Sequence, residues 1–179
     1  GWRPYRTIYF GSWDGEESGL IGSTEFGENL YENFTNENVV TYINLDMTVI
    51  GKQFRFSGDP LMRTVGYDTA KEVIMPDGGE TLFDNFTNTG NDAGMVGAGS
   101  DYTVFQYYNG IPTIDIGFSG SAGTYHSSYD TIAWQDVVDN DWTYAQSIAQ
   151  YGALLGYKLS YYDIIPFDIA SLVDNMYLW

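Results

Sequence analysis

Three acidic residues and one histidine stand directly after predicted strands of this sequence. Glu16 and Glu17 are adjacent and follow an apolar, β-branched run. Asp46 ends a second such run, and His126, the single histidine, lies in the loop after a third. Carboxylate oxygen and imidazole nitrogen together are typical ligands of zinc and similar divalent ions. Adjacent glutamates fit such a site, because one can bind the metal while the other acts as a general base on a metal-activated water.

Simpler interpretations of the same residues remain open at this point. His126 can be an ordinary surface histidine, Asp46 can cap a turn, and the glutamate pair can belong to a solvated loop. Residues 14–25 partly match a calcium-binding EF-hand loop, but a predicted strand precedes them where a helix is needed. Residues 117–121 resemble the nucleophile elbow of serine hydrolases but lack its final glycine. Glycosidases need two carboxyls roughly 5–9.5 Å apart, which sequence neighbours seldom supply.

Strands and helices alternate along the chain, and this order should position the four residues. Such alternation predicts an α/β fold, a three-layer sandwich in which helices flank a mixed, largely parallel sheet. Ligands of these sheets collect at the carboxyl ends of the strands, so three strand ends should bring the residues to one rim. We expect residues 75–99 to be long and irregular and residues 119–130 to form a loop. The predicted strands are residues 7–13, 39–46, 53–57 and 112–118, and the predicted helices are residues 22–34, 60–74, 101–108, 141–159 and 166–178.

Composition narrows the class of protein. Hydrophobic residues make up 44% of the 179 residues, enough for a packed core, and we expect residues 1–179 to form a single domain. The 24 acidic residues against 7 basic ones give a formal net charge of −17, which argues against nucleic acid as a partner. The sequons at Asn33 and Asn85 predict glycosylation on exposed loops and favour a secretory setting.

Several motifs resemble those of peptidase family M28, the zinc aminopeptidases and carboxypeptidases. The stretches SWDGEESGLIGSTEF, YINLD and TYHSSYDT carry the resemblance in this order and spacing, and GAGSDYTVFQ followed by GIP supports it. The branch that they resemble is the one of glutamate carboxypeptidase II, which includes the transferrin receptors. The resemblance implies the later two-thirds of a zinc exopeptidase domain, truncated at both ends. The remaining part would then belong to the same precursor or to another chain.

The resemblance implies roles for five residues through their places in these motifs. Glu16 corresponds to the catalytic base, and Glu17 and His126 correspond to ligands of one zinc ion. Asp46 corresponds to a ligand of a second zinc ion, and the Tyr125 hydroxyl corresponds to the group that stabilises the tetrahedral oxyanion. The implied reaction is hydrolysis of a peptide bond by a metal-bound hydroxide, with Glu16 as the proton carrier.

Further implied roles concern calcium and substrate. Glu25 and Glu28 correspond to two carboxylates of a structural calcium site, and plain surface charge is the alternative for both. Ala98, Gly99 and Ser100 correspond to a substrate-binding loop. The glutamate carboxypeptidase branch has serine and asparagine in place of Ala98 and Ser100, so contacts near the substrate should differ.

Departures from the family pattern restrict these expectations. The family's second histidine and its metal-bridging aspartate come from a segment before residue 1. We therefore expect the chain alone to bind zinc too weakly to act as a peptidase. Asp115 and Gly117 stand where carboxypeptidases of acidic peptides have arginines, which argues against a preference for acidic side chains.

Two classes of function remain. The first is a fragment of a co-catalytic di-zinc exopeptidase that acts on peptides in an extracellular, secretory or vacuolar compartment, with a homodimer as the intact protein. The second is a non-catalytic ectodomain like the transferrin receptors. The sequence favours the first, because an inactive relative has no reason to keep the base, the carboxylates and the histidine together.

Overall fold

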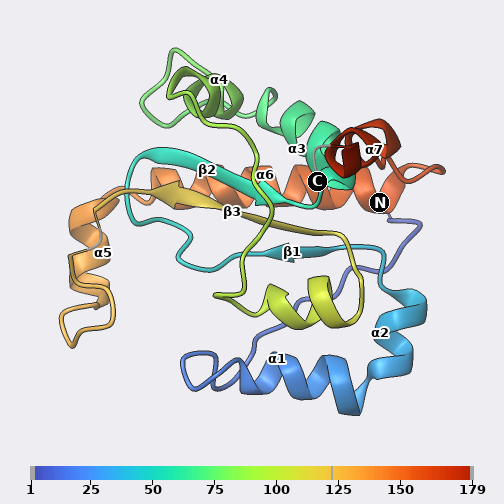
Figure 1. Cartoon of the computed structure of the whole chain (residues 1–179). Coiled ribbons are helices and arrows are strands. Elements are labelled where there is room, and N and C mark those ends of the chain that lie inside the picture. The colour runs from blue at the N-terminus through green and yellow to red at the C-terminus, as the bar shows by residue number, and fades with distance from the viewer. Residues whose placement is uncertain (1–2, 122, 178–179) are drawn as a thin grey trace.

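The computed structural model describes residues 3–121 and 123–177, which form a mixed sheet with helices on both faces (Figure 1). The strands are β1 (Tyr42–Asn44), β2 (Gln53–Gly58) and β3 (Thr113–Ser119), in the order β1-β3-β2. β1 pairs with β3 in parallel and β2 pairs with β3 antiparallel. The predicted α/β class, with a mixed sheet flanked by helices, is confirmed.

Side-chain alternation explains why these residues form the sheet. In β2, buried and half-buried residues alternate, so that Phe54 and Phe56 point into the core. The central strand β3 is buried along most of its length, and Ile114, Ile116 and Phe118 have no exposed surface. A strand with neighbours on both sides and helices on both faces has no solvated face, which accounts for this apolar run.

One face of the sheet packs on α3 (Arg63–Ala70), α4 (Leu82–Asn88) and α6 (Thr143–Tyr161). Tyr151 of α6 is fully buried there, and its hydroxyl donates to the carbonyl of Gly66 in α3 at 3.1 Å. This main core is built chiefly from apolar side chains of the sheet and the three helices, including Phe54, Phe56, Met62, Val65, Leu82, Phe86, Ile114, Ile116, Phe118, Ile148, Tyr151 and Leu155.

A smaller aromatic cluster covers the other face. Tyr42 of β1 stacks on Phe105 with ring centroids 4.2 Å apart, and Trp13 Nε1 donates to the Tyr42 hydroxyl at 2.9 Å. Phe26 lies against Trp13, with ring centroids 4.9 Å apart. The helical segments on this side are α1 (Ile21–Glu25), η1 (Phe26–Leu30), α2 (Glu32–Asn38) and η3 (Val104–Tyr108).

Three further elements complete the described chain: η2 (Pro60–Met62), which leads into α3, α5 (Ile132–Val138) and α7 (Ile169–Tyr177). Thr131 caps α5 by accepting from the Trp134 amide. Within residues 3–121 and 123–177, every helix falls short of the length and apolarity that a membrane span requires.

Two sequence predictions about local structure are wrong. Residues 7–13 are not a strand: their side chains are exposed up to Trp13, and no ladder pairing joins them to the sheet in the described residues. Strand propensity alone does not make a strand, because the backbone groups also need a neighbouring strand. Residues 75–99 are not irregular throughout, because they contain α4, which begins with a capping box between Thr81 and Asp84.

Candidate active site

A tight loop between Trp13 and α1 presents the two glutamates. Gly15 and Gly19 flank the pair with φ angles of 66° and 107°, which glycine adopts without strain. The loop closes on itself, because the amides of Gly19 and Leu20 donate to the carbonyl of Glu16 at 3.0 and 2.8 Å. The glutamates therefore stand on a short, hydrogen-bonded turn immediately before a helix.

The carboxylate of Glu17 contacts the imidazole of His126. Glu17 Oε2 lies 2.8 Å from His126 Nε2, and the two side chains are 70% and 53% exposed. His126 belongs to a turn in which the Ser127 amide donates to the Thr124 carbonyl at 3.0 Å, and its φ is 58°. The Tyr125 ring stacks on the imidazole with centroids 3.7 Å apart. The fold thus joins two motifs from opposite parts of the chain.

Glu16 lies in the electrostatic field of other carboxylates. Loss of solvation raises the pKa of Glu16 above its ordinary 4.5. The charges of Asp46, Glu17 and Asp101 raise it further, while His126 opposes them. A carboxylate with a raised pKa takes up a proton more readily, which suits a group that must accept one and return it.

Tyr125 lies in the electrostatic field of some of the same carboxylates. Loss of solvation raises the pKa of Tyr125 above its ordinary 10, and the charges of Glu17, Asp46 and Glu16 raise it further. The phenol therefore keeps its proton at neutral pH and remains a hydrogen-bond donor. The side chain is 48% exposed, so a molecule from solvent can reach it.

Asp46 is held from two sides after the end of β1. Ser100 Oγ donates to Asp46 Oδ2 at 2.7 Å, and Arg55 Nη2 donates to the backbone carbonyl of Asp46 at 2.5 Å. Asn44 Nδ2 in turn donates to Ser100 Oγ at 3.1 Å. Asn44 and Ser100 are only 3% and 4% exposed, so this chain of hydrogen bonds is shielded from water and orients the Asp46 carboxylate.

The predicted substrate-binding loop is split between surface and interior. Ala98 and Gly99 are exposed, as a substrate contact requires. Ser100 is buried and its hydroxyl donates to Asp46, and its role in substrate binding stays a prediction. The cause is local: the Ser100 carbonyl accepts from the Thr103 amide at 3.0 Å, which turns the chain inward toward η3.

Asp115 and Arg55 form an ion pair next to Asp46. Arg55 Nη1 donates to Asp115 Oδ2, and Asn44 Nδ2 donates to Asp115 Oδ1 at 2.9 Å. Burial raises the pKa of Asp115, while the charge of Arg55 lowers it. A Cβ atom at Gly117 would lie 3.0 Å from the Arg55 guanidinium, so glycine leaves room for that group. Asp115 and Gly117 thus accommodate an arginine that comes from β2.

Comparison with known proteins decides the family. The sequence model of peptidase family M28 matches residues 1–150. The chain belongs to peptidase family M28. The predicted membership is therefore confirmed, and the motifs around Glu16, Asp46 and His126 lie inside the matched region.

Curated M28 relatives carry different names. A probable glutamate carboxypeptidase of Arthroderma benhamiae is 38% identical over 181 residues, covering 96% of this chain and 25% of the relative. The aminopeptidase NAALADL1 of Rattus norvegicus is 31% identical over 196 residues, covering 98% and 26%. The vacuolar protein sorting-associated protein 70 of Saccharomyces cerevisiae is 32% identical over 188 residues, covering 100% and 23%. The chain spans about a quarter of the length of these relatives.

Glu17 and His126 are the M28 motif residues whose donor atoms fit a zinc ion. A carboxylate oxygen and an imidazole nitrogen are both zinc ligands, and two ligands of a tetrahedral zinc lie about 3.3 Å apart. The observed 2.8 Å therefore has to open only slightly. Among the described residues, no group of three or more His, Cys, Asp or Glu side chains could hold a metal ion, so Asp46 does not complete a site with this pair. Zinc ligation by the three residues stays a prediction.

Calcium binding by Glu25 and Glu28 also stays a prediction. Glu25 is exposed and accepts from Asn29 Nδ2 at 2.9 Å, and Glu28 is half-buried. Within the part of the chain that the structure describes, neither residue belongs to a three-ligand metal group. A calcium ion there would need further ligands.

Both sequons lie on helices, so their predicted placement on loops is wrong. Asn33 is exposed on α2, whereas Asn85 is half-buried on α4. Asn85 Oδ1 accepts from the Phe54 amide at 2.8 Å, and its Nδ2 donates to Glu80 Oε1 at 2.9 Å. A glycan fits Asn33 better, because the Asn85 amide is already used to join α4 to β2. Glycosylation itself stays a prediction.

Sequence reasoning missed three residues of this M28 site. Asn44 and Arg55 support Asp46, and Asp101 adds negative charge near Glu16. Asp101 is 9% exposed, and its Oδ1 is buried without a hydrogen-bond partner among the described residues. Burial raises the pKa of Asp101. A single arginine in the apolar strand pattern of residues 53–58 was the signal available for Arg55.

Proposed function

We propose that this chain supplies the general base and part of the zinc site of a di-zinc M28 exopeptidase. The observation that carries the proposal is the position of Glu16, a carboxyl with a raised pKa in the field of the contacting pair Glu17 and His126. The names of two relatives, a carboxypeptidase and an aminopeptidase, support peptide bonds as the substrate class.

The described residues would divide the reaction between them. Glu17 and His126 would hold one zinc ion and Asp46 would hold a second, and zinc bound there would act as a Lewis acid toward the water and the scissile carbonyl. Glu16 accepts a proton from the attacking water and returns it to the leaving amine nitrogen. The Tyr125 hydroxyl donates a hydrogen bond to the carbonyl oxygen as negative charge develops there.

The decisive experiment uses the full-length protein that contains this chain. Glu16→Gln should keep the zinc content and lower kcat by about two to four orders of magnitude, the usual contribution of a general base. Glu37→Gln is the matched control, because Glu37 is an exposed carboxylate on α2 and should leave kcat and zinc content unchanged. Loss of zinc by Glu16→Gln with an unchanged rate per bound zinc would contradict the assigned role.

A non-catalytic ectodomain is the second candidate. The vacuolar protein sorting-associated protein 70, at 32% identity, is a relative whose name states no peptidase activity. Zinc analysis of the full-length protein together with assays on aminopeptidase and carboxypeptidase substrates separates the two candidates. Bound zinc without hydrolysis of any peptide would favour the second.

Compartment and assembly are further parts of the proposal. We place the intact protein in the extracellular space or in a secretory or vacuolar lumen, supported by the exposed sequon at Asn33. A homodimer is the proposed assembly. Mass spectrometry of the glycopeptide around Asn33 tests the first, and light scattering of the full-length protein tests the second.

A further inference from the structure

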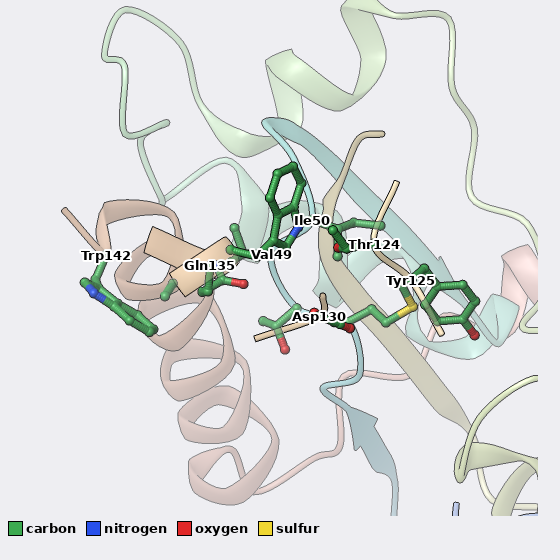
Figure 2. A pocket seen from close by; sticks show the side chains of 11 residues that line it. Val49, Ile50, Thr124, Tyr125, Asp130, Gln135 and Trp142 are labelled. Carbon is green, nitrogen blue, oxygen red and sulfur yellow. The ribbon is translucent and has the colours of Figure 1, made fainter. Parts of the chain in front are cut away.

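A cavity of about 200 Å³, here called the tyrosine cavity, lies at the carboxyl end of α6. The described residues that line it are Tyr5, Tyr161, Tyr162 and Asp163. It shares no lining residue with the larger cavity beside Tyr125 that Figure 2 shows. In Figure 1 the end of α6 lies near the N label, whereas the arrow of β3 points to the opposite side of the molecule, toward α5. The tyrosine cavity is therefore outside the candidate active site.

Hydrogen bonds between the first described segment and the end of α6 fix the walls of the tyrosine cavity. The amides of Tyr5 and Arg6 both donate to the Ser160 carbonyl at 3.1 Å. The Arg6 guanidinium donates to the carbonyls of Tyr162 and Asp163 at 2.6 and 3.1 Å. The last carbonyls of a helix need such donors, because no amide of a following turn pairs with them. The backbone that carries the lining side chains is therefore held in place before any ligand binds.

Three of the four side chains that line the tyrosine cavity are tyrosines. Tyr5 stacks on Tyr161 with ring centroids 5.4 Å apart, and Tyr161 stacks in turn on Tyr157 at 5.1 Å. Large fractions of the lining tyrosines nevertheless remain exposed, 71% of Tyr5, 37% of Tyr161 and 43% of Tyr162. A ligand from solvent can therefore reach aromatic surface here without displacing contacts within the protein.

The charges around the tyrosine cavity favour a cation. The Asp163 carboxylate is exposed and makes no ion pair or side-chain hydrogen bond with the other described residues. Arg6 does not line the cavity, and its single positive charge is balanced by that of Asp163. The negative end of the 19-residue helix α6 adds about half a unit charge, so the local sum is negative. The faces of the tyrosine rings attract cations as well.

Size and hydration select the kind of cation. Pockets for drug-sized ligands begin at about 300 Å³, so a cavity of about 200 Å³ suits a small head group. A primary ammonium is strongly hydrated, and ring faces do not replace the hydrogen bonds that it makes with water. A quaternary ammonium has no N–H group to leave unpaired, and its methyl groups pack directly on aromatic faces.

We propose that the tyrosine cavity binds a quaternary ammonium group, which contacts the rings of Tyr5, Tyr161 and Tyr162 and has the Asp163 carboxylate as its counter-charge. This binding site goes beyond the proposed peptidase function. It requires neither zinc nor Glu16, and it gives a role to exposed tyrosines that the proposed hydrolysis does not use.

The test measures ligand binding to the full-length protein that contains this chain, by nuclear magnetic resonance titration at constant ionic strength. The ligands are choline, ethanolamine, glycerophosphocholine and the uncharged isostere of choline in which carbon replaces nitrogen. Choline should bind about tenfold more tightly than the isostere, because each ring–cation contact contributes about two- to fivefold. It should also bind more tightly than ethanolamine, which is a primary ammonium, and than glycerophosphocholine, whose phosphate Asp163 repels.

The same titrations can contradict the proposal. Equal binding of choline and its isostere, or no binding of choline, would overturn the cation site. Equal binding of choline and ethanolamine would overturn the selection of a quaternary ammonium. Tighter binding of glycerophosphocholine than of choline would keep the quaternary ammonium site but name lipid head groups as its source.

Variants assign the binding to the lining residues. Tyr161→Leu and Tyr162→Leu should each weaken choline binding about two- to fivefold, and Asp163→Asn should weaken it without changing the binding of the isostere. Tyr129→Leu and Asp174→Asn are the matched controls, because both residues are exposed and neither lines the cavity. Thermal unfolding shows that each variant is folded. Choline binding that is unchanged in all three cavity variants would overturn the site, whereas loss of peptidase activity alone would leave it standing.

Discussion

Glu17 Oε2 and His126 Nε2 lie 2.8 Å apart, although one residue precedes the first helix and the other follows the last strand. The contact is on the surface, with both side chains more than half exposed. Exposed ion pairs of this kind contribute roughly 0–1 kcal/mol to stability, because water screens them. The contact itself therefore adds little to stability, and zinc ligation is the role that we propose for the pair.

The first prediction separates the contribution of the Glu17–His126 pair to stability from its contribution to zinc binding. Glu17→Gln should lower the free energy of unfolding of the zinc-free full-length protein by no more than the ~1 kcal/mol of an exposed pair, while its zinc content falls markedly. Atomic absorption after dialysis, beside thermal unfolding with a chelator present, measures both. A large loss of stability without zinc, with zinc binding unchanged, would reverse the interpretation.

The second prediction concerns Ser100, a buried residue whose hydroxyl donates to Asp46. Ser100→Ala removes the 2.7 Å hydrogen bond to Asp46 Oδ2, and the loss of such a supporting group typically lowers metal affinity or activity about 10- to 100-fold. Zinc affinity should therefore fall, while KM for a small dipeptide changes little. Competition with a calibrated chelator gives the first quantity and steady-state kinetics the second. A change in KM alone would instead favour the predicted role of Ser100 in substrate binding.

The third prediction uses the pair Arg55 and Asp115. Arg55→Met leaves the Asp115 carboxylate buried without its cation, which should cost about 3 kcal/mol of stability. Adding Asp115→Asn should recover much of that loss, because the neutral amide needs no counter-charge. Denaturant unfolding of the two single variants and the double variant forms the cycle. Strictly additive losses would show that the two side chains do not interact.

The fourth prediction is a pH dependence at α7. Asp168 Oδ1 accepts from the Ser171 amide at 2.8 Å, Thr64 also donates to its carboxylate, and these bonds lower the pKa of Asp168. Because the folded-state pKa lies below the unfolded value of about 3.9, this stabilisation is complete above that pH and is lost as the pH falls through the folded pKa.

Asp168→Ala should accordingly cost about 1 kcal/mol at pH 7, the usual cost of losing an N-cap. The difference from the unsubstituted protein should shrink at strongly acidic pH. Urea unfolding at the two pH values measures it, and Asp174→Ala, at an exposed carboxylate on the same helix, should have no such effect. A deficit that stays constant with pH would mean that the charged carboxylate is not what stabilises the cap.

Motifs and periodicity predicted much of this protein correctly. The strands at residues 53–57 and 112–118 appear within one residue of their predicted limits as β2 and β3, because their apolar runs are buried in the sheet. The long helix α6 appears close to its predicted limits for the same reason. The sequence also predicted that Glu16, Glu17 and His126 belong to one site, and the structure places Glu17 in contact with His126.

The predictions that were wrong depended on contacts between distant parts of the chain, which no local sequence pattern contains. Residues 7–13 have the composition of a strand but no strand beside them among the described residues, and backbone groups cannot make a ladder alone. Asn85 carries a sequon like that of Asn33, yet packing of α4 against β2 uses its amide. Strand propensity and sequence motifs depend on the residue and its chain neighbours, whereas strand pairing and burial depend on what packs beside the residue in the fold.

The sequence by itself determined the family and the kinds of chemical group that the site contains. Those follow from residue identity and spacing, which folding does not change. Only the tertiary structure decided that Glu17 meets His126, that Ser100 turns inward to Asp46, and that Arg55 neutralises Asp115. These relationships join β1, β2, β3 and the loops between them, and long-range contacts exist only after the sheet has brought distant segments together.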